Sequence, residues 1–159
     1  CMLILLSFVT VNAQEKKELK EGDQAPTFKY LDINGKEVSL SDLKGKYVYI
    51  DVWATWCGPC QYELPHLKEL EKKMHGKKIV FVSISCDKDK AAWEKMVKEQ
   101  GLGGVQLHNG GDREFMTAFG IRGIPRFILL DKEGKVVNAN MTRPSNAETE
   151  KTLKALKGI

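Results

Sequence analysis

The sequence has little net charge, no internal repeat and no low-complexity segment. Its formal charge of +4 over 159 residues is too small to indicate a nucleic-acid-binding surface. Lysines alternate with glutamates in segments such as EKKELKE, which is typical of a solvated face. The hydrophobic share of 42% and the charged share of 29% are ordinary for a globular protein. The length therefore predicts one domain with a sizeable apolar core.

The N-terminal apolar run is short. Residues 2–11 read MLILLSFVTV, and a small-x-small pattern ending at Ala13 predicts signal-peptide cleavage after that residue. A membrane span needs about 20 apolar residues. Because the sequence starts at Cys1 without an initiator methionine or a basic leader, we expect its first residues to be missing. The missing residues could extend the apolar run to the length of a span, so a truncated membrane anchor is the alternative. Residues 1–13 are thus interpreted as a signal-peptide remnant or truncated anchor, and 14–159 as one domain outside the cytoplasm, where cysteine pairs can oxidise.

Hydrophobic patterning predicts alternating strands and helices. Asn34-Gly35 lies between two apolar segments, 28–33 and 36–40, and is the strongest two-residue hairpin signal. Buried strands are expected over 47–53 and 78–85 because these runs are rich in β-branched and aromatic residues. Two longer helices are expected over 57–74, interrupted only by Pro65, and over about 89–100, and a short helix is expected to be capped by Asp112. A hairpin is expected from 126–131 and KVVNA. A final helix should begin at a capping box of Ser145 and Glu148 and end at Gly158. This order predicts an α/β fold with a helix-covered central sheet.

Cysteine is scarce, but two of the four cysteines are close together in WATWCGPC, where Gly58 and Pro59 separate Cys57 from Cys60. Zinc normally needs four ligands, and the remaining cysteines and three histidines lack the spacing of a zinc site, so neither a metal nor another cofactor is expected. A purely structural disulfide is also disfavoured, because closing so small a loop removes little chain entropy. Redox exchange is the function that the spacing supports best.

The expected position of the cysteines suggests their roles. Cys57 is predicted to lie where a buried strand ends and a helix begins, and the unpaired N–H groups there favour a thiolate. Cys57 would therefore attack a partner's disulfide to form a mixed disulfide. Cys60, one helical turn later and facing the core, would then displace the partner. Pro59 would stiffen the turn between the two thiols.

Two carboxylates are further candidates. Asp51 lies inside YVYIDVW, where burial should raise its pKa and make it a base for the Cys60 thiol. The alternative is a structural ion pair between Asp51 and a lysine. Glu63 follows Cys60 by one turn and either tunes both thiols or is simply a favourable charge near the helix N-terminus.

The segments DVWATWCGPC, GIPRFILLD and APTFKYLDINGKEVSLSDLKGK resemble thioredoxin-fold proteins, and more narrowly the TlpA/ResA-like extracytoplasmic thiol–disulfide oxidoreductases. The resemblance runs from about Gln24 to Gly158, and such proteins often carry a glutamate at the position of Glu63. It implies a thioredoxin-like three-layer α/β/α fold with a central mixed sheet and an added N-terminal β-hairpin.

The resemblance also implies a substrate-binding surface. The proline at position 125 is expected to be cis and to lie beside the cysteines, which leaves the backbone of Ile124 free to pair with an extended substrate. Trp56, Gly58 and Pro59 would line the same surface. Arg126 departs from the threonine usual in thioredoxins.

The sequence thus predicts a thiol–disulfide oxidoreductase of the bacterial periplasm or the extracytoplasmic face of the cell membrane, working as a monomeric reductant. Its expected partners are disulfide-containing or dithiol proteins, an apocytochrome c among the candidates, and an upstream membrane thiol reductase. Nucleic acid is not an expected partner, and a membrane is one only if the N-terminal segment is retained as an anchor. Cys86 is expected to be an unpaired thiol without an electron-transfer role.

Two rival functions remain open. A thiol peroxidase of the peroxiredoxin-like group would carry Pro-x-x-x-Thr-x-x-Cys, but Ile50 and Ala54 occupy those positions before Cys57. A non-catalytic thioredoxin-fold binding module would not need to keep both thiols and Asp51 together with the Ile124-Pro125 step.

Overall fold

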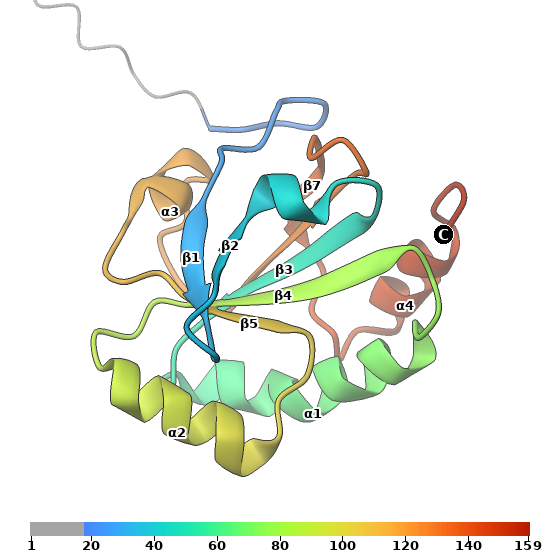
Figure 1. Ribbon diagram of the computed structural model, residues 1–159. Coiled ribbons are helices and arrows are strands. Elements are labelled where there is room, and N and C mark those ends of the chain that lie inside the picture. Colours follow the sequence, from blue (N-terminus) through green and yellow to red (C-terminus); the bar gives the residue numbers. More distant parts are fainter. Residues whose placement is uncertain (1–17) are drawn as a thin grey trace, which may run out of the picture.

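A mixed sheet of seven strands forms the centre of the computed structural model, which describes residues 18–159 (Figure 1). The strands are β1 (Lys29–Asp32), β2 (Glu37–Ser39), β3 (Tyr47–Trp53), β4 (Ile79–Ser85), β5 (Val105–His108), β6 (Arg126–Leu130) and β7 (Val136–Met141). Their order in the sheet is β2-β1-β5-β4-β3-β6-β7. The three central strands β3, β4 and β5 are parallel, and the other pairings are antiparallel. The carboxyl ends of the parallel strands therefore meet at one edge of the sheet.

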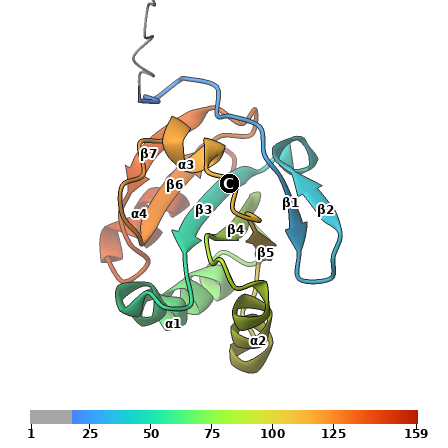
Figure 2. The same cartoon turned by 90° about the vertical axis from the view of Figure 1, so that its left-hand side faces the viewer.

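Helices cover both faces of this sheet. They are α1 (Gly58–Lys73), α2 (Lys90–Gln100), α3 (Glu114–Ala118) and α4 (Ala147–Lys154), with a 3-10 turn over Leu40–Leu43. The helices α1, α2 and α4 pack on one face, and α3 packs on the other, while the hairpin β1–β2 extends the sheet beyond β5 (Figures 1 and 2). The predicted α/β class, three layers and N-terminal hairpin are confirmed.

Alternation along β3 explains the two layers of core. Ile50 and Val52 point toward α3, where Phe115 and Phe119 belong to the same buried cluster. Tyr49 and the residues at every second position point to the opposite face, which α1, α2 and α4 cover. A strand buried on both faces is expected to be a continuous apolar run, so the carboxylate of Asp51 within it is exceptional.

Helix α1 continues through Pro65 as one uninterrupted helix. Pro65 is exposed, whereas Leu64 and Leu67 are buried against the sheet. The apolar spacing on both sides of the proline thus determines this element, as the sequence predicts.

Strand β5 was not predicted from the sequence. Its four residues VQLH alternate between apolar and polar side chains, and glycines precede and follow it. Gln106 and His108 are nevertheless buried, because they face the side of the sheet that α1 and α2 cover. Such a short strand with buried polar residues gives no apolar run by which to recognise it.

The predicted ends of α4 were wrong. The N-cap is Asn146, whose side chain accepts a hydrogen bond from the Glu148 N–H, and Ser145 bonds elsewhere. The helix ends at Lys154, with Ala155 as C-cap, so Gly158 does not close it. The N-cap of α3 is Arg113, one residue after the predicted Asp112, although the Asp112 carboxylate accepts the backbone N–H of Glu114.

The predicted signal-peptide remnant, residues 1–13, lies outside the described residues. Within residues 18–159, no helix is both long and apolar enough to cross a membrane.

Candidate active site

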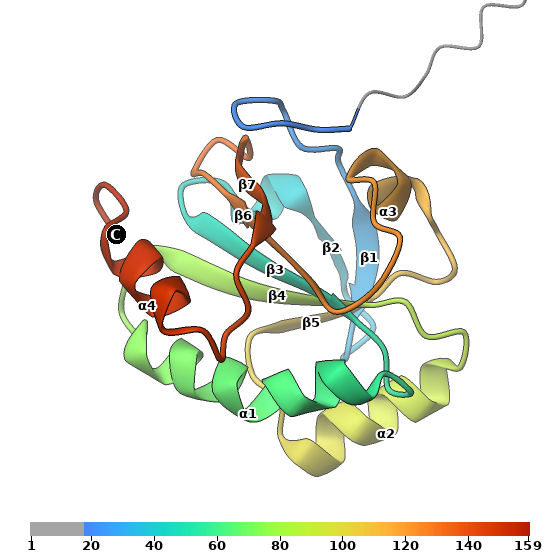
Figure 3. The ribbon, with the colours of Figure 1, turned by 180° about the vertical axis from the view of Figure 1, so that it is seen from behind.

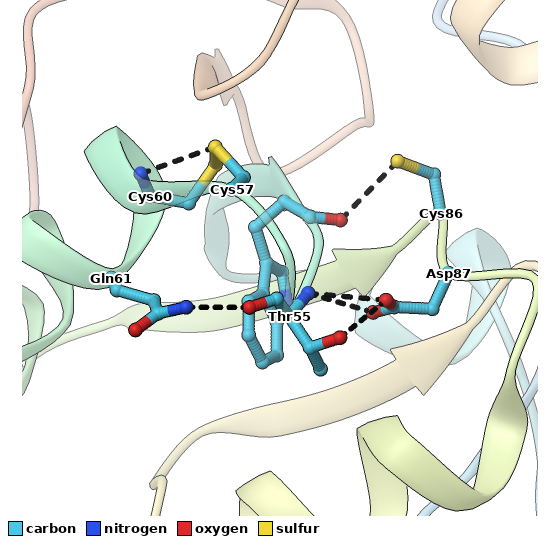
Figure 4. Close-up of a disulfide and its surroundings, with 7 residues drawn as sticks. Thr55, Cys57, Cys60, Gln61, Cys86 and Asp87 are labelled. Carbon is cyan, nitrogen blue, oxygen red and sulfur yellow. Dashed lines mark hydrogen bonds between the residues drawn. A yellow bond between two sulfur atoms is a disulfide. The ribbon is translucent and has the colours of Figure 1, made fainter.

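The two cysteines of the CGPC segment form a disulfide at the start of α1 (Figure 4). Their Cα atoms are 5.2 Å apart. Cys57 is the N-cap residue, and Cys60 lies in the first helical turn. Both side chains belong to a buried cluster with Trp53, Leu64 and residues of α2, while Gly58 and Pro59 are exposed. The predicted strand-to-helix position of the thiols is confirmed.

The N-terminus of α1 provides a positive electrostatic environment for Cys57. The backbone N–H of Cys60 donates a 3.2 Å hydrogen bond to the Cys57 sulfur. No acidic residue lies in the first turn, so no side chain compensates the partial positive charge of the 16-residue helix. A thiolate at Cys57 would therefore find a donor and a helix dipole already directed toward it.

Asp51 lies on the face of β3 that α1 covers, and it is 4% exposed. The hydroxyl of Ser83 on β4 donates a hydrogen bond of 2.5 Å to its carboxylate. Burial raises the pKa of Asp51 to about 7, an effect that the Ser83 bond opposes and that the nearby charge of Glu71 reinforces. The hydrogen-bond partner of Asp51 is a serine, and the alternative, a structural ion pair with a lysine, is not formed among the described residues.

Glu63 is also buried, at 3% exposure, but its carboxylate is directed toward the start of α4. It accepts hydrogen bonds from the backbone N–H of Ser145 at 2.9 Å and from the Ser145 hydroxyl at 2.8 Å. Glu63 thereby joins the middle of α1 to the segment before α4.

The Ile124-Pro125 peptide bond is cis, as the resemblance predicts. Ile124 is half-buried and packs against the cluster that contains both cysteines. Trp56, next to Cys57, is 70% exposed. These side chains thus frame the disulfide at the surface of the protein.

Arg126 at the start of β6 is directed away from the thiols. Its Nε donates to the Ala139 carbonyl at 3.0 Å and its Nη2 to the Phe119 carbonyl at 3.5 Å. The guanidinium therefore holds β7 and the end of α3, which accounts for its presence where thioredoxins usually have a threonine.

Cys86 is a free thiol and lies beside the redox pair. Its Sγ donates to the Trp53 carbonyl at 3.3 Å (Figure 4). Burial, and then the charge of Asp87, raises the pKa of this thiol. A raised pKa makes it a weaker nucleophile at neutral pH than a thiol at a helix N-terminus.

Asp87 was missed in the sequence analysis. Its carboxylate accepts hydrogen bonds from the backbone N–H and the hydroxyl of Thr55 at 2.7 to 3.1 Å (Figure 4). It also accepts one from the hydroxyl of Ser85 at 2.7 Å. It thereby fixes the loop between β3 and the cysteines. The sequence did contain a signal for Asp87, because it comes just after the second buried strand. The carboxyl ends of neighbouring parallel strands lie at the same edge of the sheet, so a residue at this position is expected near the cysteines.

A cleft of about 580 Å³ opens next to Trp56, the residue that precedes Cys57. Apolar side chains of Trp56, Met116 and Ile124 line it together with Cys86 and Arg113. Among residues 18–159, no group of three or more histidine, cysteine and acidic side chains is arranged to hold a metal ion.

Comparisons with known proteins agree with this geometry. The Redoxin family model matches residues 20–156. Thiol-disulfide oxidoreductase ResA of Bacillus thuringiensis is 32% identical over 143 residues, which are 89% of this chain and 82% of the relative. A proposed thiol–disulfide oxidoreductase from Bacteroides vulgatus, solved in solution, is 65% identical with a TM-score of 0.76, and the match covers 82% of this chain and 86% of that chain. The crystal structure of a thioredoxin domain of a thiol–disulfide oxidoreductase from the same organism is 31% identical with a TM-score of 0.78, over 86% of this chain and 97% of that one.

These matches cover the sheet, the hairpin and the CGPC helix together, so they extend to every element that positions the dithiol. The fold is thioredoxin-like, and the activity that the disulfide at the start of α1 serves is thiol–disulfide exchange. The chain belongs to the Redoxin family and, within it, to the TlpA/ResA-like thiol–disulfide oxidoreductases.

Proposed function

We propose that this enzyme works outside the cytoplasm as a reductant of disulfides in partner proteins, with Cys57 as the attacking thiol. The observation that carries this proposal is the position of Cys57 at the N-cap of α1, where the Cys60 N–H is directed at its sulfur. Such a position stabilises the thiolate, which is the reactive form in disulfide exchange.

The proposed reaction has two displacements. The Cys57 thiolate attacks a partner disulfide, forms a mixed disulfide and releases one partner sulfur as a thiolate. Cys60 then loses its proton and attacks Cys57, so that the Cys57–Cys60 disulfide forms and the second partner sulfur leaves. The partner gains two electrons and the enzyme loses two, while the protons of the dithiol are released to solvent and the two partner thiolates take up protons from solvent.

Three further assignments belong to the same proposal. Asp51, buried on the face of β3 beneath α1, is the base for Cys60. Glu63 shapes the dithiol environment through its place on α1. The exposed surface formed by Trp56, Gly58, Pro59 and the Ile124-Pro125 step receives an extended partner segment, because the peptide groups beside this cis step lie at the cleft.

The proposed partners follow from family membership and from the predicted leader. They are disulfide-containing or dithiol proteins, with an apocytochrome c as one candidate, and a membrane thiol reductase that restores the dithiol. The enzyme acts as a monomer in the periplasm or on the outer face of the cell membrane.

Insulin reduction with dithiothreitol tests the proposed function. Cys57→Ala should lose turnover, because the attacking thiolate is gone, whereas Cys86→Ala should stay close to the wild-type rate. Reduced protein should also react far faster with a peptide disulfide than with hydrogen peroxide. Rapid stoichiometric peroxide consumption that is lost in Cys57→Ser would favour a peroxidase, and wild-type protein inactive with both substrates would favour a binding module.

A further inference from the structure

A row of polar side chains crosses three strands beneath α1. Asp51 on β3 pairs in register with Ser83 on β4, and Ser83 pairs with Gln106 on β5. All three side chains are buried, at 4%, 2% and 4% exposure. They face the same side of the sheet, because their neighbours in sequence belong to the core on the opposite side. Buried polar rows of this kind require hydrogen-bond partners.

Gln106 is the exceptional member of this row. Its Nε2 donates to the Gly103 carbonyl at 2.7 Å, which fixes the orientation of the amide. Its Oε1 is fully buried and has no hydrogen-bond partner. An unpartnered buried acceptor is costly, so the surroundings should supply a donor.

Glu71 of α1 reaches the same place. Helix α1 runs along one face of the sheet (Figure 3). Glu71 follows Cys60 by 11 residues, about three helical turns, so the helical period places both residues on the same side of α1. A Cβ on Gly103 would clash with the Glu71 carboxylate, and a Cβ on Gly104 would lie 3.1 Å from its Oε1. The two glycines therefore leave room for this carboxylate beside the amide of Gln106.

Glu71 lies at a cleft that is open to solvent, and its charge acts on Asp51. It lines an open cleft of about 540 Å³ together with Met74 and Phe81. Burial raises the pKa of Glu71 to about 7, and the charge of Glu71 in turn contributes to the raised pKa of Asp51. Two carboxyl groups of similar pKa, one enclosed and one at a cleft, can exchange a proton with little loss of free energy.

We propose that Glu71 is the proton-exchange group that connects the buried Asp51 with solvent along the row formed by Ser83 and Gln106. This inference rests on the proposed function, in which Asp51 takes the proton of Cys60. The neutral Asp51 carboxyl passes that proton through the Ser83 hydroxyl toward the Glu71 carboxylate, which becomes neutral. The protonated Glu71 donates to Gln106 Oε1 and then releases the proton to water in the cleft, while the partner thiolate takes its proton from solvent.

Other charged groups face this path. The charge of Lys68 lowers the pKa of Glu71. The cleft is also lined by Lys46, His75, Lys77 and Lys78. Tyr49 is a further titratable group near Asp51, and burial, followed by the charges of Asp51 and Glu63, raises the pKa of its hydroxyl.

The test follows the decay of a mixed disulfide between Cys57 and thionitrobenzoate, in which Cys60 releases the coloured thiolate. In weakly buffered solution near pH 7, Glu71→Gln should decay about tenfold more slowly than wild type, a smaller loss than the 10²–10⁴-fold typical of removing the base itself. Imidazole, a small proton carrier that can enter the cleft, should restore the rate. Glu69→Gln, an exposed change on the same helix, is the matched control and should decay like wild type in every buffer.

Two results would overturn the inference. One is a Glu71→Gln rate equal to wild type in weak buffer, and the other is a slow rate that imidazole leaves unchanged, which indicates a structural or purely electrostatic effect. Insulin reduction by the wild-type enzyme tests the proposed function separately. A wild type that reduces insulin while Glu71→Gln matches it throughout would therefore remove only the assignment of Glu71.

Discussion

At the scale of single residues, burial decides which side chains carry chemistry. Asp51 was predictable because one carboxylate inside an apolar strand stands out in the sequence. The hydrogen-bond partners of the buried carboxylates were not predictable in this way. Ser83 and Asp87 lie 32 residues from the groups that they bind, and Ser145 lies 82 residues from Glu63, so only the folded chain brings these pairs together.

The first prediction concerns Asp51 and pH. The pKa of an aspartate in an unfolded chain is about 3.9, and burial raises that of Asp51 to about 7. The folded protein therefore binds a proton that the unfolded chain has lost, and this stabilisation, complete below about pH 4, disappears as the pH rises through 7. Asp51→Asn should have the higher free energy of unfolding at pH 8, by about 2–4 kcal/mol, with the difference shrinking toward pH 5.

Urea unfolding of the oxidised proteins at several pH values measures this difference. Glu71 titrates in both proteins, so the difference reports Asp51 together with its charge interaction with Glu71. A difference between wild type and Asp51→Asn that does not vary with pH would contradict the pKa argument.

At the scale of elements, apolar periodicity predicted the long strands and helices, including α1 through Pro65. It failed at β5, where Gln106 and His108 interrupt the apolar run, and at the start of α4. Ser145 has the sequence position of a capping residue, but the buried carboxylate of Glu63 uses its hydroxyl and N–H. A tertiary contact thus replaces the local cap, and Asn146 takes over the capping role.

The second prediction tests this contact between α1 and α4. Ser145→Ala removes the hydroxyl donor and leaves a buried carboxylate oxygen without its partner, which typically costs about 1–3 kcal/mol. The free energy of unfolding should fall by that amount in urea titrations. Thr152→Ala, an exposed change in α4, is the control and should change stability little. Equal effects of the two substitutions would show that the Glu63 bond adds nothing to stability.

At the scale of the whole molecule, the N-terminal hairpin completes the sheet. β1 pairs with β5, and Phe28 packs against Tyr30 at 5.3 Å and Phe115 of α3 at 5.7 Å between ring centroids. The hairpin thereby covers the edge of β5 and closes the core beneath α3. The Asn34-Gly35 turn and the family resemblance made its presence predictable, but not that it would lie against β5.

The third prediction tests whether the hairpin is part of the main core. Phe28 is 3% exposed, so Phe28→Ala should lower the free energy of unfolding by about 3–5 kcal/mol. The unfolding transition should remain a single cooperative step by both fluorescence and circular dichroism. Leu31→Ala, in the same hairpin but 43% exposed, should have a much smaller effect. A separate early transition for Phe28→Ala would instead indicate that the hairpin folds independently.

The orientation of the disulfide at the start of α1 also has a stereochemical consequence. Displacement at sulfur proceeds with the attacking, central and leaving sulfur atoms nearly in line, so the direction of approach decides which sulfur is attacked. Cys57 adjoins the exposed Trp56, whereas Cys60 lies in the first turn of α1, 2% exposed within the cluster that Trp93 and Val97 complete. Cys57 is the more exposed of the two, at 5%, so a thiolate from solvent reaches the bond more readily on the side where Cys57 is the central atom and Cys60 the leaving group. The burial of Cys60 therefore favours one regiochemistry of exchange, independently of the difference in acidity between the two thiols.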